Sequence, residues 1–436
     1  MGGDSGIRAF QGRFLTLTDD PAYGNSALRY IEDGLMIVEN GLITAIGDRP
    51  ALRHRLARGT IVHNLGRRLV LPGFVDTHVH MPQLDVIARH GAQLLDWLER
   101  YTFPEESRFA DPDHAAEVSA LFCGELLRNG TTSAMAFCTV HPGSVDAVFQ
   151  AAETLGMRMT AGKSAMDRNA PDTLMDTAQT SYDDNKALIA RWHGRGRLTY
   201  AVTPRFAATS STAQLRLAGA LLGEHDGLLM QTHLSENRAE VDWVLSLFPE
   251  CDHYLDVYRH FGLLTDRSLF AHAIHLSDGE FAMLADHGGT IAHCPTSNFF
   301  LGSGLFDSAR AAAAGVCFGL GSDVGAGTGF SMFQTMAGAY KVSQMCGTPL
   351  DAPRLFYLAT LGGARAIRQD AHIGSLEPGK EADFIVLDPE ATPLLARRTA
   401  RSDSIADLLF ALAMLGDDRL VCETYVMGRR VYSKAP

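Results

Sequence analysis

The chain has 436 residues, of which 46 % are apolar and 20 % charged, and its formal net charge is −12. This length is sufficient for a large core and more than one domain, and the composition is that of an ordinary globular protein. An acidic chain without a basic tract repels a phosphate backbone, so we expect no nucleic-acid partner. The longest apolar run, residues 408–415, is far shorter than the roughly 20 residues of a transmembrane helix. We therefore expect no membrane association.

Seven cysteines are scattered along the chain without a CxxC pair. An odd, scattered set is typical of reduced thiols and favours neither a disulfide framework nor a cysteine metal site. The first ten residues have neither the basic nor the apolar region of a signal peptide. Together these observations predict a cytoplasmic protein.

Both ends of the chain carry the pattern of short β-strands. Apolar and polar residues alternate in the segments 12–19, 33–41, 42–48, 382–388 and 422–432. Asn40-Gly41 is typical of a hairpin turn, and Gly428 is expected in another. Neither end is long enough to close a sheet alone. We therefore predict that residues 1–71 and 371–436 pair into one small β-sandwich domain.

Residues 72–370 repeat a different pattern, in which a short apolar run precedes a stretch with helical periodicity. The apolar runs are 73–80, 131–137, 158–164, 198–204, 227–236, 268–277, 290–297 and 316–323. Two of the helical stretches have Gly130 and Gly223 near their C-terminal ends. Eight strand–helix units predict an α/β fold of the (β/α)₈ TIM-barrel type, whose parallel strands end at one face. A doubly wound open sheet is the alternative, but no glycine-rich phosphate loop follows the first strand.

Histidines and carboxylates recur at the predicted strand ends. His78 and His80 are two residues apart in a strand, so they point to the same face. In a barrel they meet His233, His272 and Asp323, which end the fifth, sixth and eighth strands. Imidazoles with a carboxylate suit Zn²⁺ and also Fe²⁺. A chance His-x-His pair is common among 17 histidines, but suitable residues at four strand ends predict a metal site.

Glu236 follows His233 by three residues, and this spacing can bring its carboxylate over the site without making it a ligand. Such a group can carry a proton between water and substrate; the alternative is an ordinary acid at a helix N-terminus. The expected ligands are His78, His80, His233 and Asp323. His272 could bind the metal or orient the attacking water, and we favour the second because four ligands are already supplied. Asp323 can both bind the metal and accept a proton from the water.

Three further features have competing interpretations. Lys163 could be carboxylated and bridge two metal ions, but we prefer a packed or surface lysine and one ion per chain. His293 is interpreted equally as a packing residue or as a neighbour of the metal ligands. Trp97, Tyr101 and Phe103 form an aromatic run after the first strand, for which packing is favoured over a lid.

The segments PGFVDTHVH, THLSE, AH and GSD, with the composite terminal domain, resemble the amidohydrolase superfamily over essentially the whole chain. Within it the chain is similar to the guanine deaminase family. The segments that carry this closer likeness include HMPQ (80–83), LLDWLERYTFPEE (94–106), KSAMDRNAPDTL (163–174), TPRFAATSS (203–211) and GLGSDVGAGTGFSM (319–332).

The resemblance implies a homodimeric enzyme that converts guanine and water into xanthine and ammonia with one Zn²⁺ per chain. By the same resemblance, His78, His80, His233 and Asp323 bind the metal, Glu236 shuttles the proton, and His272 and Asp323 handle the water. It also implies that Gln83 and Arg205 hydrogen-bond the purine edge and that Phe206 packs on the ring.

The residue types at these substrate positions agree with a purine ligand. A guanidinium can bridge the O6 and N7 acceptors, and an amide can match a lactam edge. The competing interpretations are a surface salt bridge for Arg205 and core packing for Phe206. Other functions that stay open are deamination of 8-oxoguanine or a pterin, hydrolysis of a cyclic amide at two metals, and a non-catalytic scaffold.

Overall fold

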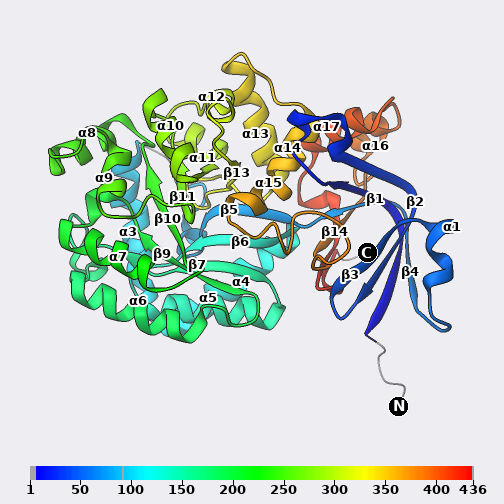
Figure 1. Ribbon diagram of the computed structural model, residues 1–436, viewed down its shortest axis with the longest axis horizontal. Helices are drawn as coiled ribbons and strands as arrows, with labels where there is room; N and C mark the ends of the chain where they lie inside the picture. The colour runs from blue at the N-terminus through cyan, green and yellow to red at the C-terminus, as the bar shows by residue number, and fades with distance from the viewer. Residues whose placement is uncertain (1–5, 91–92, 435–436) are drawn as a thin grey trace.

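In the computed structural model, which describes residues 6–90 and 93–434, the central region forms a closed barrel (Figure 1). Its described strands are β5 Phe74–His80, β6 Thr131–Phe137, β7 Arg158–Gly162, β9 Leu198–Pro204, β10 Leu229–Leu234, β11 Ser268–His272, β12 Thr290–His293 and β13 Phe318–Leu320. Neighbouring strands pair in parallel, and β8 (Ser164–Ala165) lies beside β9. Past β13, Asp323 N donates to His78 O at 2.9 Å and His80 N donates to Val324 O at 2.8 Å, which closes the barrel. The predicted TIM-type barrel is confirmed.

Helices cover the outside of the barrel and connect its strands (Figure 1). They are α4 Pro112–Arg128, α5 Pro142–Leu155, α6 Ala178–Trp192, α7 Thr212–Glu224, α8 Arg238–Leu247, α9 Tyr254–His260, α10 Asp278–His287, α11 Pro295–Phe300, α12 Ser308–Ala313, α13 Met332–Met345, α14 Ala352–Leu358 and α15 Leu361–Ala366. Gly130, with φ +83°, lets the chain turn from α4 into β6 as predicted. By contrast, α7 continues through Gly223 and ends at Glu224.

Short helical segments occupy the connection between β5 and α4. They are η4 Met81–Val86, α2 Leu94–Trp97, η5 Leu98–Thr102, α3 Phe103–Ser107 and η6 Arg108–Ala110. Trp97 and Phe103 are buried and Tyr101 is half-buried, in an apolar cluster that also contains Leu301 from the end of α11. The run packs in the core as the favoured interpretation expects, and Trp97 also lines the pocket described below.

The two ends of the chain build a second, smaller domain, as predicted (Figure 1). Its strands, in spatial order, are β16 Arg429–Ser433, β15 Val421–Val426, β14 Phe384–Leu387, β4 Val62–Pro72, β1 Ile7–Leu17, β2 Leu28–Glu39 and β3 Leu42–Asp48. They are hydrogen-bonded into one continuous sheet, and side chains from both ends, among them Phe10, Phe14 and Phe384, share one core. The predicted Asn40-Gly41 turn joins β2 and β3, with both residues at positive φ.

Other parts of the terminal regions have no counterpart among the predicted strands. Strand β4 lies between β1 and β14 in the middle of the sheet. After β3 come α1 Arg49–Leu52 and η3 Arg53–Arg55, and earlier η1 Pro21–Tyr23 and η2 Asn25–Ala27. Helices α16 Pro393–Thr399 and α17 Ile405–Leu415 and turn η9 Asp418–Leu420 separate β14 from β15, and α17 packs on α13 and α14. The domain limits at 71/72 and 370/371 stay predictions.

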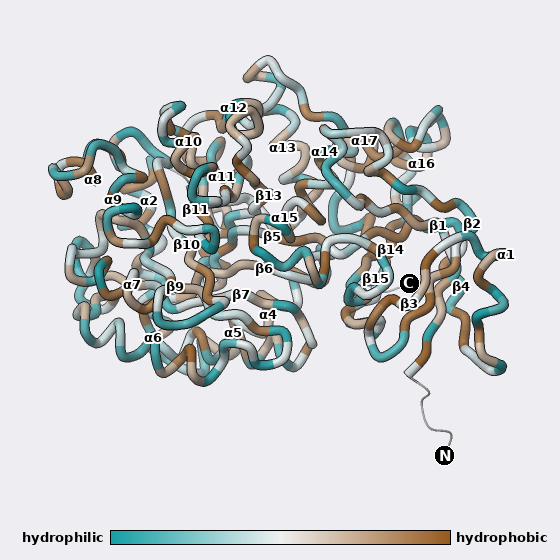
Figure 2. Tube along the Cα trace, viewed as in Figure 1, coloured by the Kyte–Doolittle hydropathy of each residue, from teal (hydrophilic) through white to brown (hydrophobic). Residues whose placement is uncertain are grey.

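Apolar stretches are prominent in the terminal sheet, whereas polar and apolar stretches alternate in the outer helices (Figure 2). This alternation matches helices with one face on the barrel and one in solvent. No helix within 6–90 and 93–434 is long and apolar enough to cross a membrane.

Candidate active site

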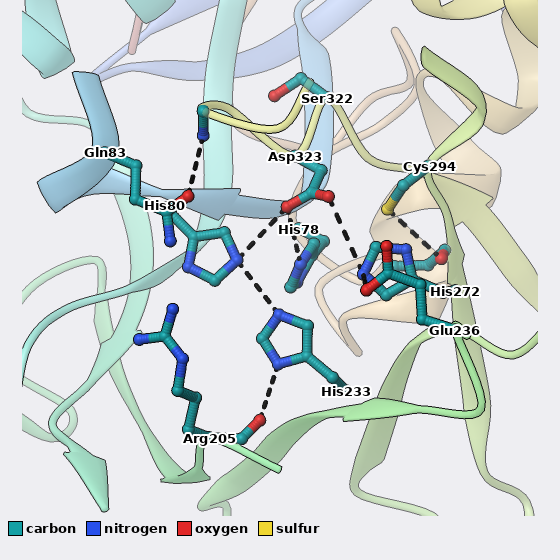
Figure 3. Close-up of polar contacts among 12 residues, drawn as sticks. His78, His80, Gln83, Arg205, His233, Glu236, His272, Cys294, Ser322 and Asp323 are labelled. Carbon is teal, nitrogen blue, oxygen red and sulfur yellow. Dashed lines mark hydrogen bonds and ion pairs between the residues drawn. The ribbon is translucent and has the colours of Figure 1, made fainter. Parts of the chain in front are cut away.

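Four side chains that were predicted as metal ligands converge at the mouth of the barrel (Figure 3). His78 Nε2 and His80 Nε2 lie 3.2 Å and 3.3 Å from Asp323 Oδ1, and His233 Nε2 lies 3.2 Å from His80 Nε2. A tetrahedral ion with ligands at about 2.0–2.1 Å separates neighbouring ligand atoms by about 3.3 Å. The spacing and the chemistry of these donors therefore fit a small divalent metal ion.

The protonation states of these groups also suit a metal. Burial lowers the pKa of His80 to about 3 and the pKa of His233 well below its usual value, so both imidazoles are neutral with a free lone pair. Burial alone raises the pKa of Asp323, but the adjacent His78 and His80 outweigh it and hold that pKa well below the usual range. Asp323 is thus held as an anion beside these imidazoles.

Backbone and side-chain acceptors determine which imidazole nitrogen faces the site. His233 Nδ1 lies 2.6 Å from the carbonyl oxygen of Arg205, so the Nδ1 hydrogen is donated there and Nε2 is left for a metal. His272 Nδ1 lies 2.9 Å from Asn298 Oδ1, which leaves its Nε2 toward Glu236 and Asp323. His272 Nε2 is 3.4 Å from Glu236 Oε2 and 3.8 Å from Asp323 Oδ2.

Glu236 is buried in the same pocket without belonging to the ligand cluster. Its Oε1 accepts a hydrogen bond from Ser303 Oγ at 3.1 Å. Burial, reinforced by the negative charge of Asp323, raises the pKa of Glu236 to about 8. A carboxyl group that titrates near neutral pH can both donate and accept a proton.

Backbone strain is concentrated at these strand ends. Ser235, His272, Ala273 and Asp323 have φ between 49° and 71°, the left-handed region that non-glycine residues rarely adopt. The surrounding contacts must hold these residues in place, as is common at functional sites.

The pocket beside these groups contains all the predicted substrate residues. Its lining residues are His80, Gln83, Leu94, Trp97, Leu98, Arg205, Phe206, His233, Glu236, Glu240, His272, Leu301, Asp323 and Ala326. Arg205 is buried, so the alternative interpretation of this residue as part of a surface salt bridge is wrong. Phe206 is also buried and lies edge-on to Trp243, with ring centroids 6.0 Å apart, so it packs in the core and lines the pocket at once.

Lys163 and His293 lie outside this lining. Lys163 is fully buried and ion-paired with Asp176, as a packed lysine. His293 packs on Phe306 with ring centroids 4.7 Å apart, and burial lowers its pKa to about 3, which favours the packing interpretation.

Several residues that support the site were not predicted. Glu106 accepts hydrogen bonds from Gln83 and Arg205. Asp76 accepts bonds from the backbone of His78 and Ser322. Glu240 accepts bonds from the backbone N–H groups of Glu236 and Asn237. Only Glu240 had a local signal, because Asn237 and Glu240 are spaced as a helix capping box.

Comparison with known proteins agrees with this geometry. The amidohydrolase family matches residues 69–431. The guanine deaminase of Escherichia coli K12 is 49 % identical over 100 % of both chains, and a probable guanine deaminase of Deinococcus radiodurans is 39 % identical over 98 % of this chain and 99 % of its own.

Solved structures give the same result. The E. coli guanine deaminase structure superposes with a TM-score of 0.97 at 49 % identity, covering 98 % of this chain and 100 % of the other. A guanine deaminase from C. acetobutylicum with bound guanine has a TM-score of 0.89 at 29 % identity, with the same coverage. The chain therefore belongs to the amidohydrolase family and, within it, to the guanine deaminases.

Proposed function

We propose that this protein is a metal-dependent deaminase that hydrolyses guanine to xanthine and ammonia. The observation that carries the proposal is the convergence of His78, His80, His233 and Asp323 beside a pocket that is lined by Glu236, Gln83 and Arg205. The first group is a metal-ligand set, Glu236 is a proton carrier, and the two wall residues are donors for a purine edge.

His78, His80, His233 and Asp323 would hold the metal. A bound Zn²⁺ would supply Lewis acidity that lowers the pKa of water from 15.7 to about 7. Asp323 accepts a proton from the attacking water, and His272 orients that water. Glu236 protonates N3 of guanine as C2 is attacked. It then takes the remaining hydroxyl proton and delivers it to the amino group, which leaves as ammonia, and the proton held by Asp323 returns to Glu236.

Arg205 and Gln83 recognise the base. A guanidinium can donate to both O6 and N7, and a buried amide adds a donor and an acceptor. Phe206 packs against the ring, a contact of roughly 1–3 kcal/mol for stacked bases. The guanine-bound relative from C. acetobutylicum supports a guanine ligand for this pocket.

The proposal includes one zinc ion per chain, although the same ligands accept iron. We also propose that the protein is a homodimer and is located in the cytoplasm.

The test is ammonia release from guanine by the purified protein, before and after chelation, with xanthine identified by its ultraviolet spectrum. Metal content is measured by mass spectrometry, and assembly by light scattering. We expect activity that is lost on chelation and restored by Zn²⁺, with one metal per chain.

A metal-loaded protein that is inactive on guanine contradicts the proposal. In that case 8-oxoguanine, pterins and cyclic amides are assayed next.

A further inference from the structure

Glu106 is a buried carboxylate that holds two pocket residues at once. Its Oε1 accepts a hydrogen bond from Gln83 Nε2 at 3.0 Å, and its Oε2 accepts one from Arg205 Nη1 at 2.5 Å. Since the side chains of Glu106 and Arg205 are 0 % and 3 % exposed, the guanidinium requires a partner charge, which Glu106 supplies. Phe103 covers the guanidinium, with Arg205 Cζ 5.5 Å from the ring centroid.

The amide of Gln83 has only one orientation that satisfies both neighbours. Its Oε1 accepts from Gly325 N at 3.2 Å while its Nε2 donates to Glu106. Rotating the amide by 180° would bring N–H against N–H at Gly325 and oxygen against oxygen at Glu106, leaving buried groups unpaired. A carboxylate only accepts, so Glu106 decides which end of the amide is the donor.

This orientation gives the pocket wall a polarity. Figure 3 shows the Gln83 nitrogen on the side of the Arg205 guanidinium and the Gln83 oxygen on the loop that carries Asp323. The acceptor end therefore lies on the loop that carries Asp323, and the donor ends lie beside Glu106. One Oε1 lone pair and one Nε2 hydrogen of Gln83 remain for a ligand.

The polarity matches a 6-oxopurine whose C2 faces the metal ligands. In guanine the N1–H donor adjoins C2, and the O6 and N7 acceptors follow along the same edge. N1–H then meets Gln83 Oε1, while O6 and N7 meet Gln83 Nε2 and Arg205. In 2,6-diaminopurine this edge is reversed, because N1 is an acceptor and the 6-amino group is a donor.

We infer that Glu106 is a positioning residue that makes the pocket select purines with an oxo group at C6. It acts through Gln83 and Arg205 and does not touch the substrate itself. The inference rests on the proposed function, since the reacting ligand is guanine.

The experiment compares guanine with 2,6-diaminopurine, because both carry a 2-amino group. kcat and KM are measured by ammonia release for the metal-loaded wild type, Glu106→Gln and Glu106→Asp. An amide at position 106 presents N–H to Gln83 or to Arg205, so we expect Glu106→Gln to raise KM for guanine about 10- to 100-fold. The ratio of kcat/KM for guanine to that for 2,6-diaminopurine should fall by a similar factor, while Glu106→Asp keeps more of the preference.

A double variant tests the reversed polarity and covers the case in which Glu106→Gln folds poorly. Gln83→Glu combined with Glu106→Gln restores the hydrogen bond between the two positions with its direction reversed. The carboxylate at position 83 then offers only acceptors to the base. We expect its unfolding midpoint to exceed that of Glu106→Gln, and its preference to shift toward 2,6-diaminopurine.

The matched control is Glu280→Gln, a change at a buried carboxylate outside the pocket lining. It should leave the substrate ratio within about threefold, because an amide oxygen can accept the same hydrogen bonds from Ser277. A folded Glu106→Gln variant with the wild-type substrate ratio overturns the inference.

Failure of the proposed function gives a different result. If the wild type releases no ammonia from guanine, the affinities for hypoxanthine and for adenine are measured by calorimetry, and their ratio tests the inference. We then expect the wild type to prefer hypoxanthine and Glu106→Gln to lose that preference, and an unchanged preference overturns it.

Discussion

Glu236 lies 3.4 Å from His272 Nε2 and accepts a hydrogen bond from Ser303, so the residue is held over the ligand cluster but is not part of it. Glu236→Gln keeps the size of the side chain and its bond from Ser303 but removes the site of proton transfer. We expect kcat for guanine to fall about 10²- to 10⁴-fold with unchanged metal content. Steady-state kinetics and metal analysis check this.

The control for that change is Ser303→Ala. It removes only the bond that orients Glu236, so a loss of about tenfold is expected from one hydrogen bond. Turnover by Glu236→Gln close to that of the wild type would remove Glu236 from the reaction.

At the scale of elements, the segment from α2 to α3 forms one wall of the pocket and part of the core. Trp97 belongs to both, because it lines the pocket and is buried in the cluster with Phe103 and Leu301. Trp97→Leu leaves a void, so we expect a loss of about 2 kcal/mol in the free energy of unfolding and a several-fold rise in KM for guanine. Denaturant unfolding and kinetics measure the two effects.

The matched control is Tyr101→Leu, a change in the same cluster at a residue outside the pocket lining. It should reduce stability without changing KM. Equal effects of both substitutions on KM would mean that the wall acts only through stability.

At the scale of the whole molecule, buried ion pairs join the barrel to the terminal sheet. Arg158 begins β7 and Arg197 precedes β9, at the end of the barrel opposite the pocket, and both donate to Glu381 before β14. Burial acts to raise the pKa of Glu381, but Arg158 and Arg197 outweigh it and lower that pKa from about 4.5. The charged form of Glu381 thus stabilises the fold.

Glu381→Gln should therefore cost about 3 kcal/mol in the free energy of unfolding near pH 7, because it leaves buried guanidinium groups short of a partner charge. Because the folded pKa is depressed, this contribution is complete above about pH 4.5 and is lost as the pH falls below it. Urea unfolding of wild type and variant at several pH values measures the difference.

The control for this prediction is Asp33→Asn, which breaks the exposed pair with Arg49 and should leave the stability almost unchanged. kcat/KM for guanine should be unchanged in both variants, since catalytic groups of such barrels lie at the opposite face. A large loss of activity in Glu381→Gln would contradict this separation of stability from catalysis.

Local periodicity was sufficient to predict much of this protein. The apolar runs of the barrel and the hairpin at Asn40-Gly41 follow from side-chain alternation and turn chemistry, which depend only on near neighbours. His78 and His80 share a face because a strand repeats every two residues, and the barrel rule then brings His233, His272 and Asp323 to the same mouth.

Only the tertiary structure decided which groups support these residues. Glu106 and Arg205 are 99 residues apart, and Ser303 and Glu236 are 67 apart, so neither contact has a spacing that a local pattern could indicate. No local pattern indicates that the Arg205 carbonyl orients His233. Nor does any local pattern indicate that β4 lies in the middle of the terminal sheet. A buried polar group is satisfied by whichever partner the packing of distant segments brings to it, and that packing is a property of the whole fold.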